Sequence, residues 1–233
     1  MLKIRCSQIG KIMTNARSKK DVLSSSTKKY LQELAIENMF GRYKEFKSKY
    51  TDKGIIKEDE SIRLVEEVLQ TGFIWKNEEK YKNDFLTGIP DVVADDFVLD
   101  VKTSWDIFTY PHFEEELTNK GYYYQLMGYM WLTGKTRAYL CYCLVNTPTE
   151  QVEDEIRREH WQQKLIDESQ EVRDHVESKH KFDDIDNKLK VKSYRVDYDE
   201  EVIMQIKNRI IDCRVYYNDL IEKLTIKDFA DVK

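Results

Sequence analysis

The chain has 233 residues, a length that suits one domain, or one domain with appendages, and allows a substantial core. Apolar residues make up 41% of the sequence, and only 3 Pro and 8 Gly occur, which argues against a disordered or fibrous chain. No stretch approaches the roughly 20 apolar residues of a membrane span, and the first residues lack the apolar run of a signal peptide. We therefore expect a cytoplasmic protein that does not enter a membrane.

The net charge of −5 hides an uneven distribution along the chain. Residues 1–50 carry 12 Lys and Arg against 4 Asp and Glu, so the remaining residues are strongly acidic. A basic segment is the electrostatic footprint expected of a protein that contacts phosphates. A solvated surface without a partner explains the same charges equally well, so charge alone does not decide between the two.

Hydrophobic periodicity and turn residues predict the elements in chain order. The first part of the chain is expected to be helical, with helices at residues 7–13, 27–40 and 54–70 and a mobile polar connection at 44–53. Further along, strands and helices alternate: strands at 73–75, 84–86, 92–93 and 97–102, a helix at 122–133, a strand at 137–145, a highly charged helix at 150–180, a strand at 190–196 and an amphipathic helix at 200–224. This order predicts an α/β fold with a mixed β-sheet flanked by helices.

Two aspartates and a lysine form the first candidate site. Pro90 fixes the backbone just before Asp91, and Asp100 and Lys102 point to the same face of a strand because side chains alternate. Two carboxylates can hold a hard cation such as Mg²⁺, which polarises a phosphodiester and lowers the pKa of a bound water. Lys102 can orient that water or stabilise charge on the phosphate. The spacing Asp-x-Lys alone is common, and a solvated strand face is its ordinary explanation.

Glu58 is a candidate third carboxylate on the helix at 54–70. Helical geometry places it within an apolar stripe of Ile55, Ile62, Val65 and Leu69. A carboxylate on a buried face is costly unless it is paired or binds a metal. A salt bridge to a core Lys or Arg, or a favourable position at the helix start, explains it equally well.

Gln125 shares one helix face with Tyr122, Tyr129 and Leu132. A glutamine on an apolar face needs a hydrogen-bond partner. An attacking water beside a metal would serve, and a backbone carbonyl would serve as well.

These residues occur in one order: Gly54-x-x-x-Glu58, Pro90-Asp91, Asp100-x-Lys102 and Gln125-x-x-x-Tyr129. The set resembles the lambda-exonuclease and YqaJ-like branch of the PD-(D/E)xK nuclease superfamily. Residues 5–12, with the sequence RCSQIGKI, resemble the N-terminal serine motif of that branch, and residues 122–131 resemble its Gln/Tyr helix. The resemblance covers about residues 4–148.

The resemblance implies a single nuclease domain over residues 1–233. Its restriction-endonuclease-like core would span about 54–148, followed by a C-terminal helical extension over about 149–233. The implied metal ligands are Glu58, Asp91, Asp100 and the carbonyl of Val101. The implied catalytic lysine is Lys102, and Gln125 would help to place the water.

The resemblance also implies contacts with DNA. Ser7 would lie where the branch contacts a terminal 5′-phosphate, and Arg5 or Arg17 would replace the arginine that the branch places several residues before that serine. Tyr129 is assigned to the same binding surface. Trp105 follows the strand of Asp100 closely, so we expect it to line the DNA groove or to be core.

The function expected from these features is that of a Mg²⁺- or Mn²⁺-dependent DNA nuclease. A 5′→3′ double-strand exonuclease of phage-type recombination or repair is preferred, located in the host cytoplasm if a phage encodes it. DNA, a single-strand annealing protein and further copies of the chain are the expected partners. The alternatives are a structure-selective or nicking endonuclease on the same fold, and a catalytically silent nucleic-acid-binding module.

Overall fold

A mixed four-stranded sheet with the order β4-β5-β6-β7 forms the centre of the fold. The computed structural model describes residues 1–44, 48–165 and 169–225. The four strands are β4 (Val92–Val93), β5 (Val98–Thr103), β6 (Arg137–Cys143) and β7 (Val191–Asp197). β5 and β6 are parallel, whereas the outer two pairs are antiparallel, so the sheet is mixed as predicted.

A smaller sheet joins the start of the chain to the segment before β4. Its strands are β1 (Ile4–Arg5), β2 (Tyr81–Lys82) and β3 (Leu86–Gly88), in the order β1-β3-β2. β1 is parallel to β3, with Arg5 opposite Thr87. The residues that follow β1 and those that follow β3 therefore lie at the same end of this sheet.

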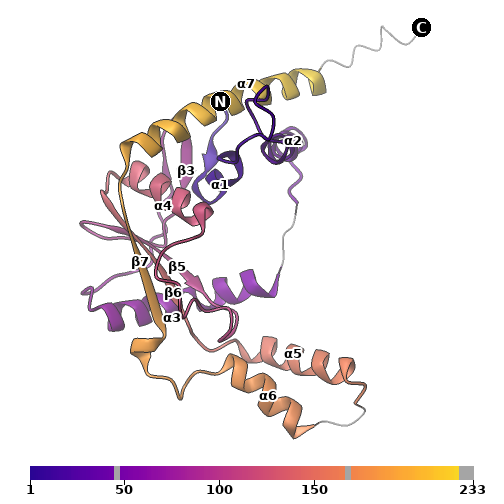
Figure 1. Cartoon of the computed structure of the whole chain (residues 1–233), viewed down its shortest axis with the longest axis vertical. Helices are drawn as coiled ribbons and strands as arrows, with labels where there is room; N and C mark the ends of the chain where they lie inside the picture. Colours follow the sequence, from indigo (N-terminus) through magenta and orange to yellow (C-terminus); the bar gives the residue numbers. More distant parts are fainter. Residues whose placement is uncertain (45–47, 166–168, 226–233) are drawn as a thin grey trace.

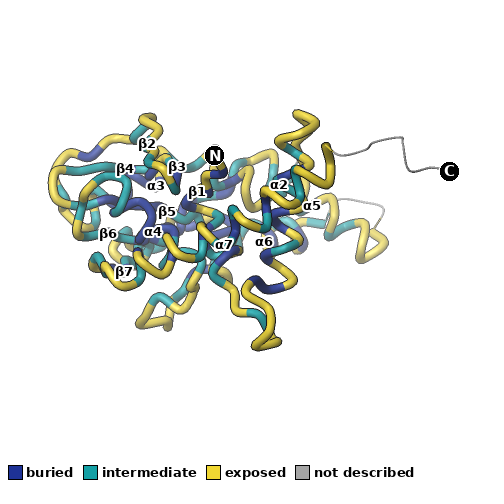
Figure 2. The backbone as a smooth tube through the Cα atoms, turned by 90° about the horizontal axis from the view of Figure 1, so that it is seen from above, coloured by how far each residue is buried: buried dark blue, intermediate teal, exposed yellow. Residues whose placement is uncertain are grey.

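Helices cover both faces of the central sheet (Figure 1). They are α1 (Ile9–Ile12), α2 (Ser25–Phe40), α3 (Lys49–Leu69), α4 (Lys120–Thr133), α5 (Thr149–Gln162), α6 (Gln170–His180) and α7 (Glu200–Thr225), with short 3-10 turns η1 (Cys6–Gln8) and η2 (Asn187–Leu189). Val98 packs in the core cluster that contains α4, α2 and α7, whereas Leu99 and Val101 pack in the cluster that contains α3. The two faces of β5 are thus buried under different helices. Figure 2 shows the buried residues gathered around β5, β6 and α4.

The N-terminal segment packs tightly on α4 through glycines. A Cβ atom built on Gly10 would lie 2.8 Å from the Cα atom of Gly121, and one built on Gly128 would lie 2.6 Å from Ile9 Cδ1. The neighbour of Gly10 is backbone, which cannot move aside easily, so α1 and α4 approach this closely there because the position is glycine; the neighbour of Gly128 is the flexible end of a side chain. This contact fixes the N-terminal residues against the helix that carries Gln125.

Helices α5 and α6 form a hairpin that projects from the sheet (Figure 1). Four residues, Val152, Ile156, Val172 and Val176, form its own small core. The backbone N–H of Thr147 donates to the carbonyl of His180 at 3.0 Å, which closes the base of the hairpin. The hairpin therefore leaves and rejoins the central domain at one place.

Several predicted elements differ from the observed ones. The long helix begins at Lys49 instead of residue 54, because Ser48 and Thr51 form a capping box, so residues 49–53 are not a polar connection. The charged segment 150–180 forms two helices, and residues 45–47 and 166–168 lie outside the described residues. No strand forms at 73–75, where one residue, Ile74, is buried and the backbone has no paired strand. The hairpin of β4 and β5 is confirmed, and so is the helix ended by Gly134, whose φ is 71°.

Candidate active site

Strand β5 places Asp100 and Lys102 on the face toward α4. Asp100 is 1% exposed, and its Oδ1 accepts a hydrogen bond of 2.8 Å from Gln125 Nε2. Lys102 Nζ forms an ion pair with Asp100 Oδ2 and lies 5.0 Å from the centre of the Tyr122 ring. The alternation of the strand therefore brings the carboxylate and the ammonium together, as the spacing of the two residues predicts.

Asp91 joins this pair across the β4–β5 hairpin. Its Oδ2 accepts a hydrogen bond of 2.7 Å from the backbone N–H of Val101. Asn77 holds the backbone of the turn, since its N–H donates to the Asp91 carbonyl at 2.7 Å and its side-chain amide donates to the Pro90 carbonyl at 3.0 Å. Asp91 thus has a fixed place beside the residue between Asp100 and Lys102.

The charges of the cluster act strongly on one another. Burial and, next, the charge of Asp100 raise the pKa of Asp91 to about 8, against the opposing effects of Lys102 and of the N–H of Val101. The charge of Glu58 adds a smaller increase to the pKa of Asp91. For Lys102, burial lowers the pKa, but the charges of Asp100 and Asp91 outweigh burial and raise it overall. The site therefore brings two carboxyl groups and one ammonium group together, with Asp100 buried and Asp91 and Lys102 half-buried.

Glu58 lies on α3 at the edge of the cluster. Its Oε1 is 3.2 Å from Lys76 Nζ, and its side chain is 23% exposed. Ile55 is 70% exposed and Leu69 is 38% exposed, so the predicted apolar stripe is buried only at Ile62 and Val65. The Glu58 side chain is therefore half-buried, and it forms a salt bridge with a lysine that lies outside the core.

Gln125 and Tyr129 stand behind Asp100 on α4. Gln125 Nε2 also lies within hydrogen-bond distance of the Tyr129 hydroxyl, at 3.0 Å, and the two side chains are 6% and 5% exposed. The partner of Gln125 is thus a carboxylate and a phenol, not a backbone carbonyl. The prediction that Tyr129 contacts DNA is wrong for this structure, because the ring is buried against Cys6 and Gly88.

Trp105 is also buried, at 7% exposure. Its ring makes edge contacts with Tyr50 and His180, at centroid distances of 5.4 Å and 4.9 Å. The expectation that it lines a DNA groove is therefore wrong, and its alternative as a core residue holds. Tyr50 lies in the first turn of α3, which begins earlier than predicted, and His180 is the last residue of α6.

Arg5 and Ser7 are exposed at the end of β1. This end lies beside the end of β3, from which the chain continues to Pro90 and Asp91. Cys6 between them is 1% exposed and anchors the segment against Gly88 and Gly128. Arg5 and Ser7 are thus accessible near the edge of the carboxylate cluster, and Arg17 is exposed in the loop after α1.

The donor set suits a hard divalent cation. Asp100 Oδ2 is buried, and the partner that the structure gives it is the ammonium of Lys102, so its remaining lone pairs are available to a cation. Carboxylate and carbonyl oxygens are the ligands that Mg²⁺ prefers. Across residues 1–44, 48–165 and 169–225, no three His, Cys, Asp or Glu side chains are close enough to hold one metal together. Two aspartates are therefore in place, and the Glu58 side chain is turned toward Lys76.

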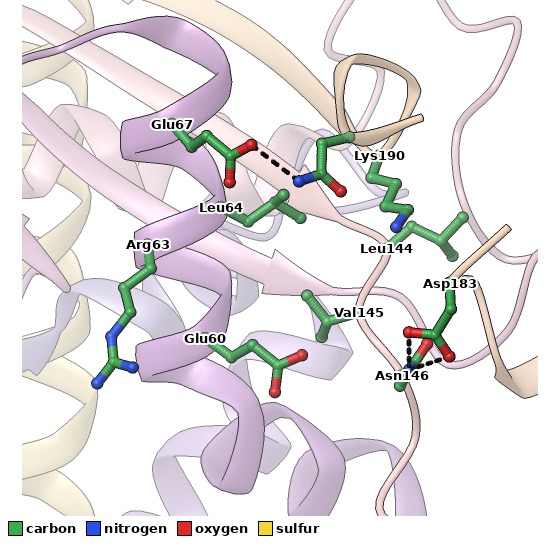
Figure 3. Close-up of a pocket in the computed structure, with 10 residues that line it drawn as sticks. Glu60, Arg63, Leu64, Glu67, Leu144, Val145, Asn146, Asp183 and Lys190 are labelled. Atoms are coloured by element: carbon green, nitrogen blue, oxygen red, sulfur yellow. Dashed lines mark hydrogen bonds between the residues drawn. The ribbon is translucent and has the colours of Figure 1, made fainter. Parts of the chain in front are cut away.

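A surface pocket of about 290 Å³ lies elsewhere, between α3, the end of β6 and η2 (Figure 3). Two hydrogen-bonded pairs line it, Asn187 with Glu67 and Asn146 with Asp183. None of the predicted site residues lines this pocket.

No helix among the described residues is long and apolar enough to cross a membrane.

Comparison with known proteins places the fold. No protein-family model and no curated protein matches the sequence. A phage-related exonuclease from Haemophilus somnus 129PT matches with a TM-score of 0.78 and 30% identity, covering 96% of each chain. An alkaline exonuclease from Laribacter hongkongensis matches with a TM-score of 0.64 and 15% identity, covering 96% of this chain and 91% of its own; its complex with dAMP matches equally well.

The fold and the cluster on β5 together define a nuclease with a restriction-endonuclease-like core. The chain belongs to the lambda-exonuclease and YqaJ-like branch of the PD-(D/E)xK nucleases, as its match to the Haemophilus somnus exonuclease shows. Sequence reasoning did not single out Asn77 and Lys76, which hold Asp91 and Glu58. Neither residue belongs to a recognisable spacing, so no signal was available to find them.

Proposed function

We propose that the protein is a Mg²⁺- or Mn²⁺-dependent exodeoxyribonuclease that degrades duplex DNA from a 5′ end. The observation that carries the proposal is the grouping of half-buried Asp91 and buried Asp100, with Lys102 on the same strand face as Asp100, in a chain that belongs to a family of phage-type nucleases. A setting in phage-type recombination or repair, in the cytoplasm, follows from the family. A single-strand annealing protein and further copies of the chain are proposed partners on the same ground.

Asp91, Asp100 and the Val101 carbonyl would hold the cation, and Glu58 would join them after its side chain turns away from Lys76. When bound, the cation supplies Lewis-acid polarisation of the phosphodiester and an acidified water. Gln125 holds Asp100 in one orientation through its 2.8 Å hydrogen bond. Ligands fixed by such hydrogen bonds bind with less loss of entropy.

Lys102 would stabilise the negative charge that builds on the phosphate during attack. Its ammonium is the one cation within the buried cluster, held by Asp100 on one side and by the ring of Tyr122 on the other. A preorganised charge of this kind is worth several kcal/mol, about 10²- to 10³-fold in rate. Lys102 would also hold the water in line.

Exposed basic and hydroxyl groups at the N-terminus would receive the DNA end. Arg5 and Ser7 lie beside the segment that leads to Asp91, and Arg17 lies in the next loop. Guanidinium and hydroxyl groups are suited to phosphate oxygens. The Laribacter hongkongensis exonuclease was crystallised with dAMP, which supports a nucleotide site on this fold.

A cleavage assay tests the proposal. Wild type and Lys102→Ala are incubated with linear and with covalently closed circular duplex DNA, with Mg²⁺ and with EDTA. We expect degradation of the linear DNA alone, by the wild type alone and only with metal. Cutting of the circle would indicate an endonuclease instead, and binding without cleavage in Mg²⁺ and in Mn²⁺ would indicate a silent binding module.

A further inference from the structure

Lys53 is a fully buried lysine that the proposed chemistry does not use. It lies on α3 with 0% exposure, and its Nζ donates a hydrogen bond of 2.9 Å to the carbonyl oxygen of Trp105. Nζ also lies 5.5 Å from the centre of the Phe182 ring. Burial lowers the pKa of Lys53 to about 7, although the charge of Asp106 opposes this shift. A buried amine is costly unless it is hydrogen-bonded, and the Trp105 carbonyl provides that hydrogen bond.

The carbonyl of Trp105 is a meeting point of four segments. Besides Lys53 of α3, it lies 3.2 Å from Thr147 Oγ1, in the connection after β6, and 3.2 Å from His180 Nδ1, at the end of α6. Trp105 itself follows β5, three residues after Lys102. The bond from Lys53 therefore ties α3 to the backbone that continues directly from the catalytic strand.

A second hydrogen bond ties the same two elements. Ser61 Oγ on α3 and Thr103 Oγ1 at the end of β5 are 2.9 Å apart. Glu58 lies between Lys53 and Ser61 on the helix, so the two bonds bracket it. Any slide of α3 along β5 would break both bonds and would carry the backbone of Glu58 with it.

We propose that Lys53 is a positioning residue, which fixes α3 on the end of β5 and so holds Glu58 within reach of the cation site at Asp91 and Asp100. This inference rests on the proposed function, since it assigns Glu58 to that site. Lys53 acts through the helix backbone and touches neither DNA nor metal. With the helix held, Glu58 needs only a side-chain rotation to exchange Lys76 for a cation.

The precision required explains why a buried clamp is useful here. Mg²⁺ demands nearly ideal octahedral geometry with ligands at about 2.1 Å. A shift of one residue along a helix moves the backbone by about 1.5 Å. A misplacement of about 1 Å commonly costs 10²-fold in rate, so a loose α3 would weaken metal binding before it unfolded the protein.

The test measures Mn²⁺ binding to the full chain by titration calorimetry, without DNA. Lys53→Met keeps the length of the side chain and removes the donor, while Thr147 and His180 continue to satisfy the Trp105 carbonyl. We expect Mn²⁺ to bind at least ten-fold more weakly than to wild type. Thermal unfolding should stay cooperative with an unchanged or higher Tm, because the variant also removes a buried amine.

Lys57→Met is the matched control. Lys57 lies one turn further along α3, closer to Glu58, and pairs with Glu60 at 2.6 Å instead of reaching β5. The Lys57→Met variant loses a lysine interaction within α3 but no bond between α3 and the end of β5. Its Mn²⁺ affinity should therefore stay within two-fold of wild type. In a Glu58→Gln background, Lys53→Met should cause no further loss, because the effect runs through Glu58.

Wild-type affinity for Mn²⁺ in a folded Lys53→Met variant would overturn the inference and leave the proposed function intact. If Lys53→Met does not fold, Lys53→Leu takes its place, and wild-type Mn²⁺ affinity in that folded variant overturns the inference equally. If wild type itself binds no Mn²⁺ and cleaves no DNA, the proposed function fails, and the inference fails with it.

Discussion

Replacing the titrating carboxyl group of Asp91 by an amide should change how the stability of the metal-free protein depends on pH. Burial and the charge of Asp100 raise the pKa of Asp91 from 3.8 to about 8. Between those two values the unfolded chain has lost this proton while the folded chain keeps it. The folded state therefore binds more protons, and its stability is greatest at low pH and declines as pH rises toward 8. The decline is at most about 1.4 kcal/mol per pH unit.

The interval from pH 5 to pH 7 lies inside this window, so the free energy of unfolding should fall by about 2 to 3 kcal/mol through Asp91 alone. His180, whose pKa burial lowers, has the opposite effect near the top of the interval. His180 is present in both wild type and Asp91→Asn, so its contribution to the pH dependence cancels when the two proteins are compared. The amide retains an oxygen to accept the N–H of Val101, so the variant keeps the geometry and loses the titration.

Urea unfolding in EDTA at pH 5, 6 and 7 measures the effect. The free energy of unfolding of wild type, relative to that of Asp91→Asn, should fall by about 2 to 3 kcal/mol from pH 5 to pH 7. A difference that stays constant across this range would refute the interpretation of the buried carboxylate pair. Saturating Mg²⁺ should abolish the wild-type decline, because a neighbouring cation favours the ionised carboxylate.

Three further substitutions probe other contacts. Gln125→Leu removes the hydrogen bond that orients Asp100 and should lower the cleavage rate about 10- to 100-fold, with the overall fold retained by circular dichroism; an unchanged rate would show that Asp100 needs no such support. Gly10→Ala forces a Cβ to 2.8 Å from the Gly121 Cα and should lower the free energy of unfolding by about 1 to 3 kcal/mol in urea, whereas no loss would mean that α1 can move away from α4. Gly54→Ala adds a Cβ in open space inside α3 and should raise stability by about 0.5 to 1 kcal/mol; a loss at this position would contradict the helix there.

Strand β5 could be predicted from the sequence because its signal is local. Asp100 and Lys102 share a face through the two-residue period of a strand, and the turn between Val93 and Val98 contains the residues typical of a hairpin. Gly134 gave an equally local signal for the end of α4. These features depend on neighbours in the chain, so no knowledge of the tertiary fold was needed.

The wrong predictions concern residues whose surroundings come from distant segments. Trp105 is covered by Tyr50 and His180, which are 55 and 75 positions away in the chain. Lysine in a helix usually lies in solvent, and the residues near Lys53 in the sequence do not predict that its side chain is completely buried. Glu58 forms its salt bridge with Lys76, which directly follows the expected strand at 73–75 that does not form. Burial at these places is decided by tertiary packing, which the periodicity of one segment does not report.

The hydrogen bond that closes the base of the α5–α6 hairpin indicates that this chain could be shortened by removing the hairpin. Because Thr147 and His180 are joined backbone to backbone at 3.0 Å, the segment between them begins and ends at nearly one point. A short turn could bridge that point without shifting the register of β6 against β7. The hairpin therefore has the geometry of an insertion, and a shortened enzyme that lacks it is a reasonable target for protein engineering.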